Sequence, residues 1–388
     1  MPRHVWWAFG STRLTLIAFG YIVLTLFPAH PVESWQGMVF PGNNWIDGWV
    51  RWDSMWYEAI VNDQPRFLPT GYSTANFFPL YSFVSWIVAL PVRLFLDHER
   101  AFYIGGLIVS SVSFPLGLKA VHRLASQLAG AAVAVRAVWL IAVFPFSFFL
   151  TAAYADGFYF CLAAWSLAFA YSGRWPLACA LASLAAMTRI PGLALFPAIG
   201  LEYLRQHDFD FRSVRKQWPS LVILAAAPLL IAGYHEWRYG DPLAFLHARQ
   251  QGWNRASGFP ALQRDFTYFF QGSVVGCGSV GECLREFEFT RHVLGYWYVA
   301  LIPWSIATVL YASRTVGVGL TVWVLTSVGM GLVNGLDGTG RFTAVLFPVF
   351  IGLAMLLRSR AAFLTVCAVW VPFLLLFFAQ FARWRQVL

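Results

Sequence analysis

The chain has 388 residues, of which 59% are hydrophobic and only 12% are charged. A water-soluble globular protein carries about 25% charged residues, so this composition excludes that class and predicts a polytopic membrane protein. The net charge of +9 is then expected on cytoplasmic loops that face anionic lipid. Nucleic acid is not an expected partner, because no basic run is interleaved with polar sequence.

Apolar stretches of span length, or a little shorter, recur along the whole chain. Arg3 and Arg13 are expected to hold the start of the first stretch in the cytoplasm, and this stretch is predicted to remain as a helix because no small-residue cleavage site precedes it. The stretches lie at residues 14–29, 102–121, 132–150, 157–172, 174–188, 190–204, 218–234, 294–312, 315–333, 342–357 and 361–380. We therefore predict an all-α protein with about eleven transmembrane helices and, since no internal repeat is detected, one integral domain over residues 1–388.

A further apolar stretch, residues 77–96, is predicted to lie along the membrane interface. If it crossed the membrane, two groups of basic residues in short loops would lie outside, against the positive-inside rule. These residues are Lys119, His122, Arg123, Arg136, Arg205, Arg212, Arg215 and Lys216. The resulting topology leaves two long outer segments, residues 30–101 and 235–293, which with a few short outer turns carry nearly all the unusual polar residues. The chemistry is therefore predicted to be extracytoplasmic.

Asp53 is the first candidate for that chemistry, within the run Arg51-Trp52-Asp53-Ser54-Met55-Trp56-Tyr57 of the first outer segment. Two structural roles are open to it: pairing with Arg51, or capping a helix that starts at Ser54. The functional alternative is a general base at the membrane surface, where a carboxylate keeps its charge while it takes a proton from a hydroxyl group. Composition alone does not separate these roles.

Several stretches in chain order then favour the functional role. They are residues 51–60 with 71–72 and 76–81, residues 145–156, residues 187–193, residues 245–253 and residues 340–348. Together they resemble the PIG-V mannosyltransferase family, which adds the second mannose of the glycosylphosphatidylinositol anchor in eukaryotes and has bacterial relatives. The chain departs from the family at Asp156, where glutamate is usual, and at Ser82, where proline is frequent.

The resemblance implies the GT-C glycosyltransferase architecture, with interfacial helices and a catalytic acid in the first outer loop. It also implies a polyprenyl-phosphate hexose as donor, with mannose as the default sugar and no other cofactor. Asp53 is expected to deprotonate an acceptor hydroxyl, so that a single displacement inverts the anomeric centre. The expected acceptor is a glycolipid, a lipid-linked glycan or a glycoprotein, and the expected location is the outer face of a bacterial plasma membrane.

Two arginines are expected to bind the donor phosphate, because guanidinium stays charged and can bind phosphate oxygens through two hydrogen bonds. Arg189 lies at a turn between short helices, where an unpartnered membrane arginine is costly, although a snorkelling side chain is the structural alternative. Arg341 follows Gly338 and Gly340 at the start of a helix, where a simple structural turn is equally compatible. Arg51 is expected to keep Asp53 ionised.

The remaining candidates have supporting roles. Trp52, Trp56 and Tyr57 are expected to anchor a short interfacial helix. Tyr154 and Asp156 precede an outer helix start, where Asp156 either caps the helix or binds a sugar hydroxyl. Gln250 and Trp253 in the second outer segment are candidates for the acceptor site, with Trp253 stacking on a sugar ring.

Cys277 and Cys283 share the second outer segment and are expected to form a disulfide in an oxidising compartment. No metal site is predicted, since histidines and acids show no ligand spacing.

Two other functional classes are alternatives to a glycosyltransferase. A flippase or transporter of a lipid-linked sugar would suit spans broken by proline and glycine, but no pair of related halves is visible. A membrane acyltransferase would require a histidine near an acid on one membrane-embedded face, and the sequence offers no such arrangement.

Overall fold

The computed structural model describes residues 2–27, 37–62, 73–210, 218–251, 258–271 and 288–385. Within these ranges, five helices are long and apolar enough to cross a membrane. They are α1 (Arg3–Leu26), α5 (His98–Ala129), α10 (Pro219–Tyr239), α14 (Glu288–Val333) and α17 (Arg360–Ala382). A sixth candidate is the pair α15 (Thr339–Val345) and α16 (Phe347–Leu356), whose axes differ by 77°. The protein is an all-α integral membrane protein.

Every predicted apolar stretch contains a helix within the described residues, but the boundaries differ. Four apolar helices have only 10 to 17 residues: α4 (Leu80–Ala89), α6 (Ala131–Val143), α7 (Ala155–Ala170) and α8 (Trp175–Thr188). Residues 190–204 divide into a 3₁₀ turn, η4 (Ile190–Ala194), and α9 (Leu195–Gln206). The predicted count of eleven spans is therefore not established by the lengths of the helices.

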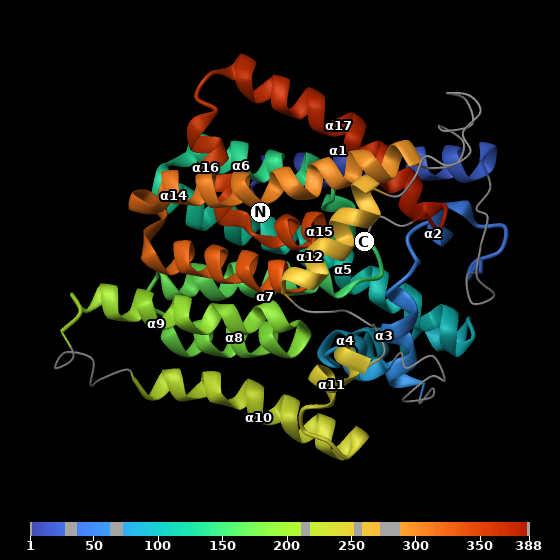
Figure 1. The fold of residues 1–388 in the computed structure, drawn as a ribbon, viewed down its shortest axis with the longest axis horizontal. Helices are drawn as coiled ribbons and strands as arrows, with labels where there is room; N and C mark the ends of the chain where they lie inside the picture. Colours follow the sequence, from blue (N-terminus) through green and yellow to red (C-terminus); the bar gives the residue numbers. More distant parts are fainter. Residues whose placement is uncertain are drawn as a thin grey trace.

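The two predicted spans at residues 294–312 and 315–333 are the two arms of α14. They meet at Gly317, whose φ of 86° breaks the helix, and the two arms run in opposite directions in Figure 1. A side chain there would be strained and would also contact the Tyr171 hydroxyl, which donates to the carbonyl oxygen of Val316. Glycine at residue 317 therefore reverses the chain.

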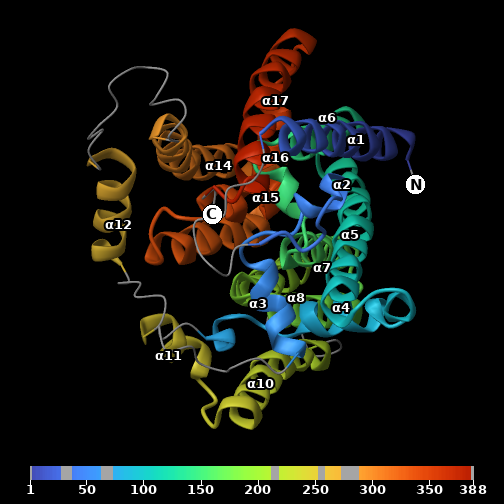
Figure 2. The same ribbon diagram turned by 90° about the vertical axis from the view of Figure 1, so that its right-hand side faces the viewer.

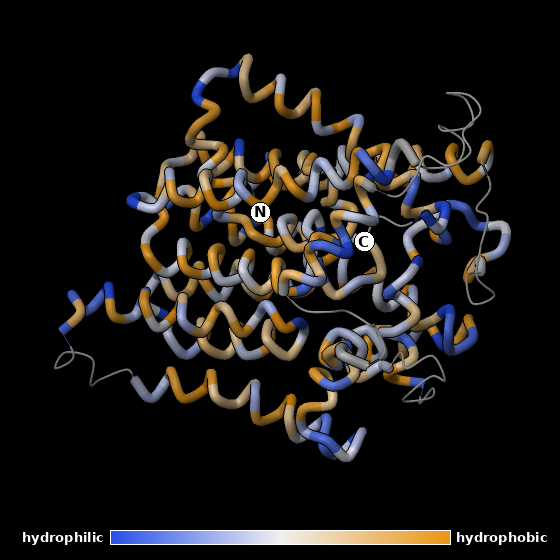
Figure 3. Tube along the Cα trace, in the orientation of Figure 1, coloured by the Kyte–Doolittle hydropathy of each residue, from blue (hydrophilic) through white to orange (hydrophobic). Residues whose placement is uncertain are grey.

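The long helices lie side by side, and the short elements of the two outer segments gather at one end. Figure 1 shows α2 (Asn44–Asp47), α3 (Ser54–Val61), α4 and α11 (Ala244–Gln251) at the right-hand end, and Figure 2 looks onto that end. In Figure 3 hydrophobic residues follow the helices, whereas hydrophilic residues concentrate at the chain reversals on the left and among the short elements on the right. The two predicted outer segments thus occupy the same end of the molecule.

The residues 77–96 form α4 and a short 3₁₀ turn, η2 (Val92–Leu94), instead of one long helix. With ten residues, α4 has about half the length of a typical span. It packs closely on α5, because Gly105 has no side chain and a methyl group there would collide with the carbonyl oxygen of Ser85. The close contact fixes the first outer segment to the helix bundle.

An interruption of the helical chain between α6 and α7 places Asp156 at the start of α7. Pro145 follows the end of α6, and residues 144–153 cross the core as 3₁₀ turn and loop. The buried Arg13 of α1 donates to the carbonyl oxygens of Ala142 and Ser147 at 2.9 and 2.8 Å. These bonds satisfy carbonyl groups that the break leaves without helical partners. The chain then enters α7, whose first turn carries Asp156.

Candidate functional site

A sharp turn before α3 carries Asp53 into the interior. The turn depends on Trp52, whose φ of 51° lies in the left-handed region that bulky side chains rarely adopt. The Trp52 ring packs against the ring of Trp384, with the two centroids 5.7 Å apart. The C-terminal end of the described chain therefore supports the turn that presents Asp53.

Arg51 anchors this turn and does not pair with Asp53. Its fully buried guanidinium forms an ion pair with Asp47, and Nε donates to the carbonyl oxygen of Ala382 at 2.8 Å. The guanidinium also lies over the ring of Trp384, with Cζ 5.0 Å from the centroid. The predicted pairing of Arg51 with Asp53 is therefore wrong, because a nearer carboxylate and backbone carbonyl groups satisfy this buried cation.

The Asp53 side chain does not cap α3, so the helix-cap interpretation is also wrong. Its Oδ2 instead accepts a hydrogen bond from Nη1 of Arg341 at 2.5 Å. The backbone N–H of Asp53 donates to the hydroxyl of Tyr154 at 3.1 Å. The side chain is 15% exposed, so Asp53 is an accessible carboxylate with a cation on one of its oxygens.

Arg341 lies in the first turn of α15, directly after the turn at Gly338. Besides Asp53, it donates from Nε to Oδ2 of Asp156 at 2.8 Å and from Nη2 to the hydroxyl of Tyr57 at 3.4 Å. Its Cζ lies 4.5 Å from the centroid of the Tyr154 ring. Two chain segments that are far apart in sequence, one with Asp53 and Tyr57 and one with Tyr154 and Asp156, therefore hold this guanidinium in place.

Asp156 is completely buried in the first turn of α7, and both of its oxygens are occupied. Oδ1 pairs with Nη1 of Arg189, while Oδ2 accepts from Arg341. The carboxylate neither caps α7, whose cap residue is Tyr154, nor lines the cavity beside it. Asp156 therefore has neither of its predicted roles. Its side chain is buried and binds Arg189 and Arg341 instead.

Arg189 lies where the chain leaves α8 in an extended conformation, with φ of −155° and ψ of 144°. The following proline, Pro191, and Gly192 then fold the chain back against α8, and a side chain at Gly192 would collide with the backbone of Ala186. Arg189 does not snorkel outward, since it pairs with Asp156 and is only 10% exposed. Its Cζ lies 5.1 Å from the centroid of the Phe342 ring.

These four side chains form a series of alternating charge: Asp53, Arg341, Asp156 and Arg189. Two carboxylates and two guanidiniums have no net formal charge, which suits a largely buried site. A buried ion pair repays its desolvation only when further hydrogen bonds satisfy it, and here Tyr57 supplies one of them. Because Asp156 binds both guanidiniums and Asp53 supplies the second negative charge, the two arginines can lie side by side.

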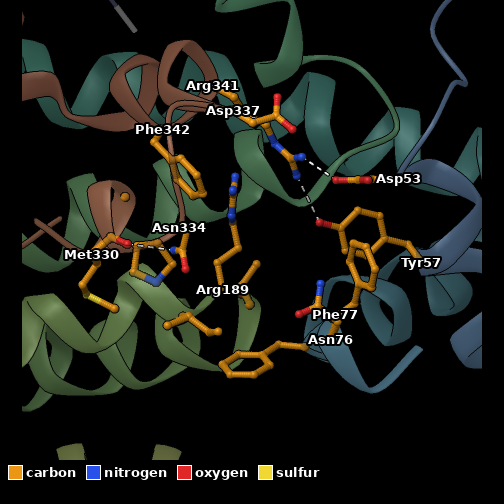
Figure 4. Close-up of a pocket in the computed structure, with 16 residues that line it drawn as sticks. Asp53, Tyr57, Asn76, Phe77, Arg189, Met330, Asn334, Asp337, Arg341 and Phe342 are labelled. Atoms are coloured by element: carbon orange, nitrogen blue, oxygen red, sulfur yellow. Dashed lines mark hydrogen bonds and ion pairs between the residues drawn. The ribbon is translucent and has the colours of Figure 1, made fainter. Parts of the chain in front are cut away.

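A cavity of about 180 Å³ opens beside this series of charges (Figure 4). Asp53, Arg189 and Arg341 all line it, so the structure brings together the three residues assigned to catalysis and phosphate binding from sequence. The remaining lining residues are Tyr57, Asn76, Phe77, Phe78, Thr188, Ile190, Pro191, Met330, Gly331, Asn334, Asp337, Gly338 and Phe342. The cavity has a polar wall around the charges and an apolar wall formed by proline, isoleucine, methionine and phenylalanine side chains.

The other predicted site residues are distributed around this cavity. Tyr57 lines it. Trp56 does not line the cavity but stacks on the lining residue Phe77, with the two ring centroids 5.9 Å apart. Burial raises the pKa of Tyr57, so its hydroxyl is held neutral beside Arg341. Trp253, Cys277, Cys283 and the side chain of Gln250 lie outside the described residues.

Sequence reasoning missed three polar lining residues, Asn76, Asn334 and Asp337. Asn76 stands inside a recognised motif, and the other two lie in the turn at residues 334–338 that precedes Arg341. A short amide or carboxylate side chain in a turn is common without any function, so only the cavity distinguishes these three.

Within the described ranges, no group of three or more histidine, cysteine, aspartate or glutamate side chains is arranged to hold a metal ion. Asp53 and Asp156 both pair with arginine instead. Whether the protein uses a metal stays a prediction from sequence.

Comparison with known proteins identifies the fold. No protein-family model and no curated protein matches the sequence, so the likeness to the PIG-V family is not confirmed. Solved structures do match. The oligosaccharyltransferase of Archaeoglobus fulgidus in complex with Zn and sulfate is 15% identical, with 97% of this chain and 53% of that chain covered and a TM-score of 0.52. The chain has the GT-C glycosyltransferase fold.

Two further matches carry lipid phosphates. ArnT from Cupriavidus metallidurans bound to undecaprenyl phosphate is 13% identical, with 93% of this chain and 61% of that chain covered and a TM-score of 0.53. AglB from Archaeoglobus fulgidus, in complex with an inhibitory peptide and a dolichol-phosphate, is 13% identical, with 96% and 56% covered and a TM-score of 0.51. This chain spans between half and two thirds of the length of these proteins.

The shared carboxylate gives a prediction about stability. Asp156→Asn leaves Arg189 and Arg341 buried side by side without their common counter-ion, and we expect it to lower the free energy of unfolding in detergent by about 3 kcal/mol. Arg341 keeps Asp53 as a counter-ion, so adding Arg189→Met removes the cation that has lost its partner and should recover part of that loss. Asp241→Asn, the same substitution at an exposed carboxylate, serves as the control. A double variant that loses as much stability as the two single losses added together would contradict the shared role.

Glu58, one turn after Asp53 on α3, gives a prediction about pH. Burial raises the pKa of Glu58 from 4.5 to about 6, with the charge of Glu99 adding to the effect and a hydrogen bond from Asn62 opposing it. The folded protein therefore binds this proton more tightly than the unfolded chain, so the stability associated with Glu58 is present below pH 4.5 and is lost as the pH rises through 6.

Glu58→Gln should thus be more stable than the parent protein at pH 7.5, by about 1 kcal/mol after allowance for partial exposure, and the difference should shrink at pH 5. Thermal unfolding in detergent at both pH values measures it. An equal difference at the two pH values would show that ionisation of Glu58 is not the cause.

Proposed function

We propose that the protein is an inverting glycosyltransferase that moves a hexose from a polyprenyl-phosphate donor to an acceptor hydroxyl group. The observation that carries this proposal is the convergence of Asp53, Arg189 and Arg341 on one cavity. A carboxylate beside two guanidiniums matches a reaction in which a hydroxyl group loses a proton while a phosphate group gains negative charge. The fold, and the lipid phosphates in the ArnT and AglB structures, support the same donor class.

In the proposed reaction, the acceptor oxygen forms a bond to the anomeric carbon as the bond from that carbon to the phosphate oxygen breaks. Asp53 takes the acceptor proton, and the electron pair of the broken bond stays on the departing phosphate. The carboxylate thus loses its charge as the phosphate gains one. A single displacement of this kind inverts the anomeric configuration.

Arg341 can interact with both groups whose charge changes in the reaction, the Asp53 carboxylate and the departing phosphate. Its Nη1 binds the charged carboxylate of Asp53. Once Asp53 is protonated, that hydrogen bond weakens, because a charge-assisted bond becomes a neutral one, and the guanidinium becomes available to the phosphate. Arg189, beside Arg341 on the same carboxylate, supplies the second cation, so the developing phosphate dianion has two guanidiniums within reach.

Asp156 is a positioning residue in this proposal. It touches neither the cavity nor a substrate, but it binds both arginines and keeps their mutual repulsion from driving them apart. Tyr154 acts similarly on the base, since its hydroxyl accepts the backbone N–H of Asp53.

Mannose is the proposed sugar, on the strength of the motifs shared with the PIG-V family. The acceptor is proposed to be a glycolipid, a lipid-linked glycan or a glycoprotein at the outer face of a bacterial plasma membrane. No metal enters the proposed reaction, because the two arginines provide the positive charge at the phosphate.

The test is transfer of radiolabelled hexose from polyprenyl-phosphate mannose to a bacterial glycolipid extract by the purified protein in detergent. We expect Asp53→Asn to reduce turnover about 10²- to 10⁴-fold, since it removes the general base while preserving side-chain shape. Glu58→Gln, one turn along the same helix and away from the cavity, should retain turnover.

Full activity of Asp53→Asn would refute the role of Asp53. Absence of transfer by the parent protein from any polyprenyl-phosphate hexose would refute the glycosyltransferase and favour a flippase for lipid-linked sugars.

A further inference from the structure

The polar turn at residues 334–338 forms part of the cavity wall and is separate from the series of charges. Asn334, Asp337 and Gly338 of this turn line the cavity, as does Phe342 one turn further along. Asn76, from the first outer segment, lines the same cavity, and Figure 4 shows the amides of Asn334 and Asn76 on either side of Arg189. None of these residues belongs to the base or to the phosphate-binding pair.

The turn is held in place by a carboxylate from the second outer segment. Asp265 lies near the end of α12 (Phe259–Phe266) and is 5% exposed. Its Oδ2 accepts the backbone N–H groups of Leu336 at 2.8 Å and of Asp337 at 3.2 Å. Its Oδ1 accepts from Nε and Nη2 of Arg264 at 2.8 and 2.6 Å.

The backbone of the turn is shaped to receive this carboxylate. Gly335 has φ of 105°, which side chains rarely adopt, and a methyl group there would collide with Oδ2 of Asp265. Gly258, just before α12, also donates its N–H to the carbonyl oxygen of Val333 at 2.8 Å. The contacts at Gly335 and Gly258 therefore join α12 to the beginning of the turn. Buried backbone N–H groups without an acceptor are costly, so Asp265 fixes the turn at one position.

The chemistry of the wall fits a sugar better than a phosphate. Asn334 donates from Nδ2 to the carbonyl oxygen of Met330 at 2.7 Å, which fixes the side chain and leaves its Oδ1 as an acceptor. Amide and carboxylate oxygens accept hydrogen bonds from hydroxyl groups, and an amide N–H₂ group donates to them. A carboxylate such as Asp337 would repel a phosphate, while the rings of Phe77 and Phe342 offer apolar faces to the C–H groups of a pyranose.

We propose that the turn at residues 334–338, held by Asp265, recognises the hydroxyl groups of the transferred sugar, with Asn334 and Asp337 as its sugar-binding residues and Asn76 facing them. The inference rests on the proposed glycosyl transfer. It divides donor recognition between two sets of residues: Arg189 and Arg341 bind the phosphate, and the turn binds the sugar. Asp265 is a positioning residue, since it acts only through the turn.

The experiment compares two ligands that differ only in the sugar. The Michaelis constant for polyprenyl-phosphate mannose is measured together with the inhibition constant of sugar-free polyprenyl phosphate. We expect Asn334→Ala and Asp337→Asn each to raise the Michaelis constant about tenfold, from the loss of a buried hydrogen bond, and to change the inhibition constant less than twofold. Arg189→Lys should raise both constants together.

The positioning role has its own comparison. Asp265→Ala removes the acceptor of two buried N–H groups and should reproduce the selective loss of sugar affinity, whereas Asp265→Asn keeps one oxygen for them and should restore most of it. Asp241→Asn, in the same outer segment, should change neither constant. Since Asp241 pairs with His247 at the surface, that variant controls for general effects on the segment.

The outcomes separate this inference from the proposed function. Transfer by the parent protein, combined with equal changes of both constants in Asn334→Ala and Asp337→Asn, would overturn the sugar-binding turn and leave the glycosyltransferase standing. Equal behaviour of Asp265→Ala and Asp265→Asn would overturn the positioning role. Absence of transfer by the parent protein would overturn both proposals.

Discussion

The buried carboxylate of Asp156 is the interaction on which the site depends. Two guanidiniums that lie close together in a region of low polarity repel each other and are costly to remove from water. Asp156 offsets both costs because one oxygen binds Arg189 and the other binds Arg341. Without a carboxylate at this position, the arginines would have to separate or turn toward solvent, and the cavity would lose its positive wall.

The remainder of the fold brings the partners of this carboxylate together. The break after α6 delivers Asp156 on the first turn of α7, and the extended exit from α8 delivers Arg189. On the other side, Arg51 ties the loop before α3 to the end of α17 through Ala382. Asp53 is thereby held at the opposite end of the series of charges. The long helices thus act as a frame, and their interruptions carry the chemistry.

Much of this arrangement could be predicted from sequence, and the parts that could not share a physical reason. Asp53, Arg189 and Arg341 stand in recognisable motifs at expected outer turns, and all three line one cavity. The all-α membrane fold followed from composition and from the length of the apolar stretches. Sequence does not reveal which buried ion pairs form, since Arg341 lies 185 residues from Asp156 and 288 from Asp53.

The same limit explains the specific errors. Arg51 stands two residues from Asp53, and proximity in sequence suggested a pair, but the buried partner is Asp47 on the preceding turn. The role of Asp265 could not be predicted from sequence, because its side chain accepts hydrogen bonds from backbone N–H groups of a turn that is distant in sequence. Helix lengths were likewise misjudged where proline interrupts an apolar run, as at Pro145: α6 ends at Val143, whereas the predicted stretch runs to residue 150.

The most direct test is a structure of the protein with a non-cleavable phosphonate analogue of polyprenyl-phosphate mannose. The account predicts that the phosphonate lies within hydrogen-bond distance of both Arg341 and Arg189, that Asp156 still binds the two arginines, and that the anomeric carbon faces Asp53. A phosphonate bound elsewhere, with Arg341 contacting only Asp53 and Asp156, would contradict it.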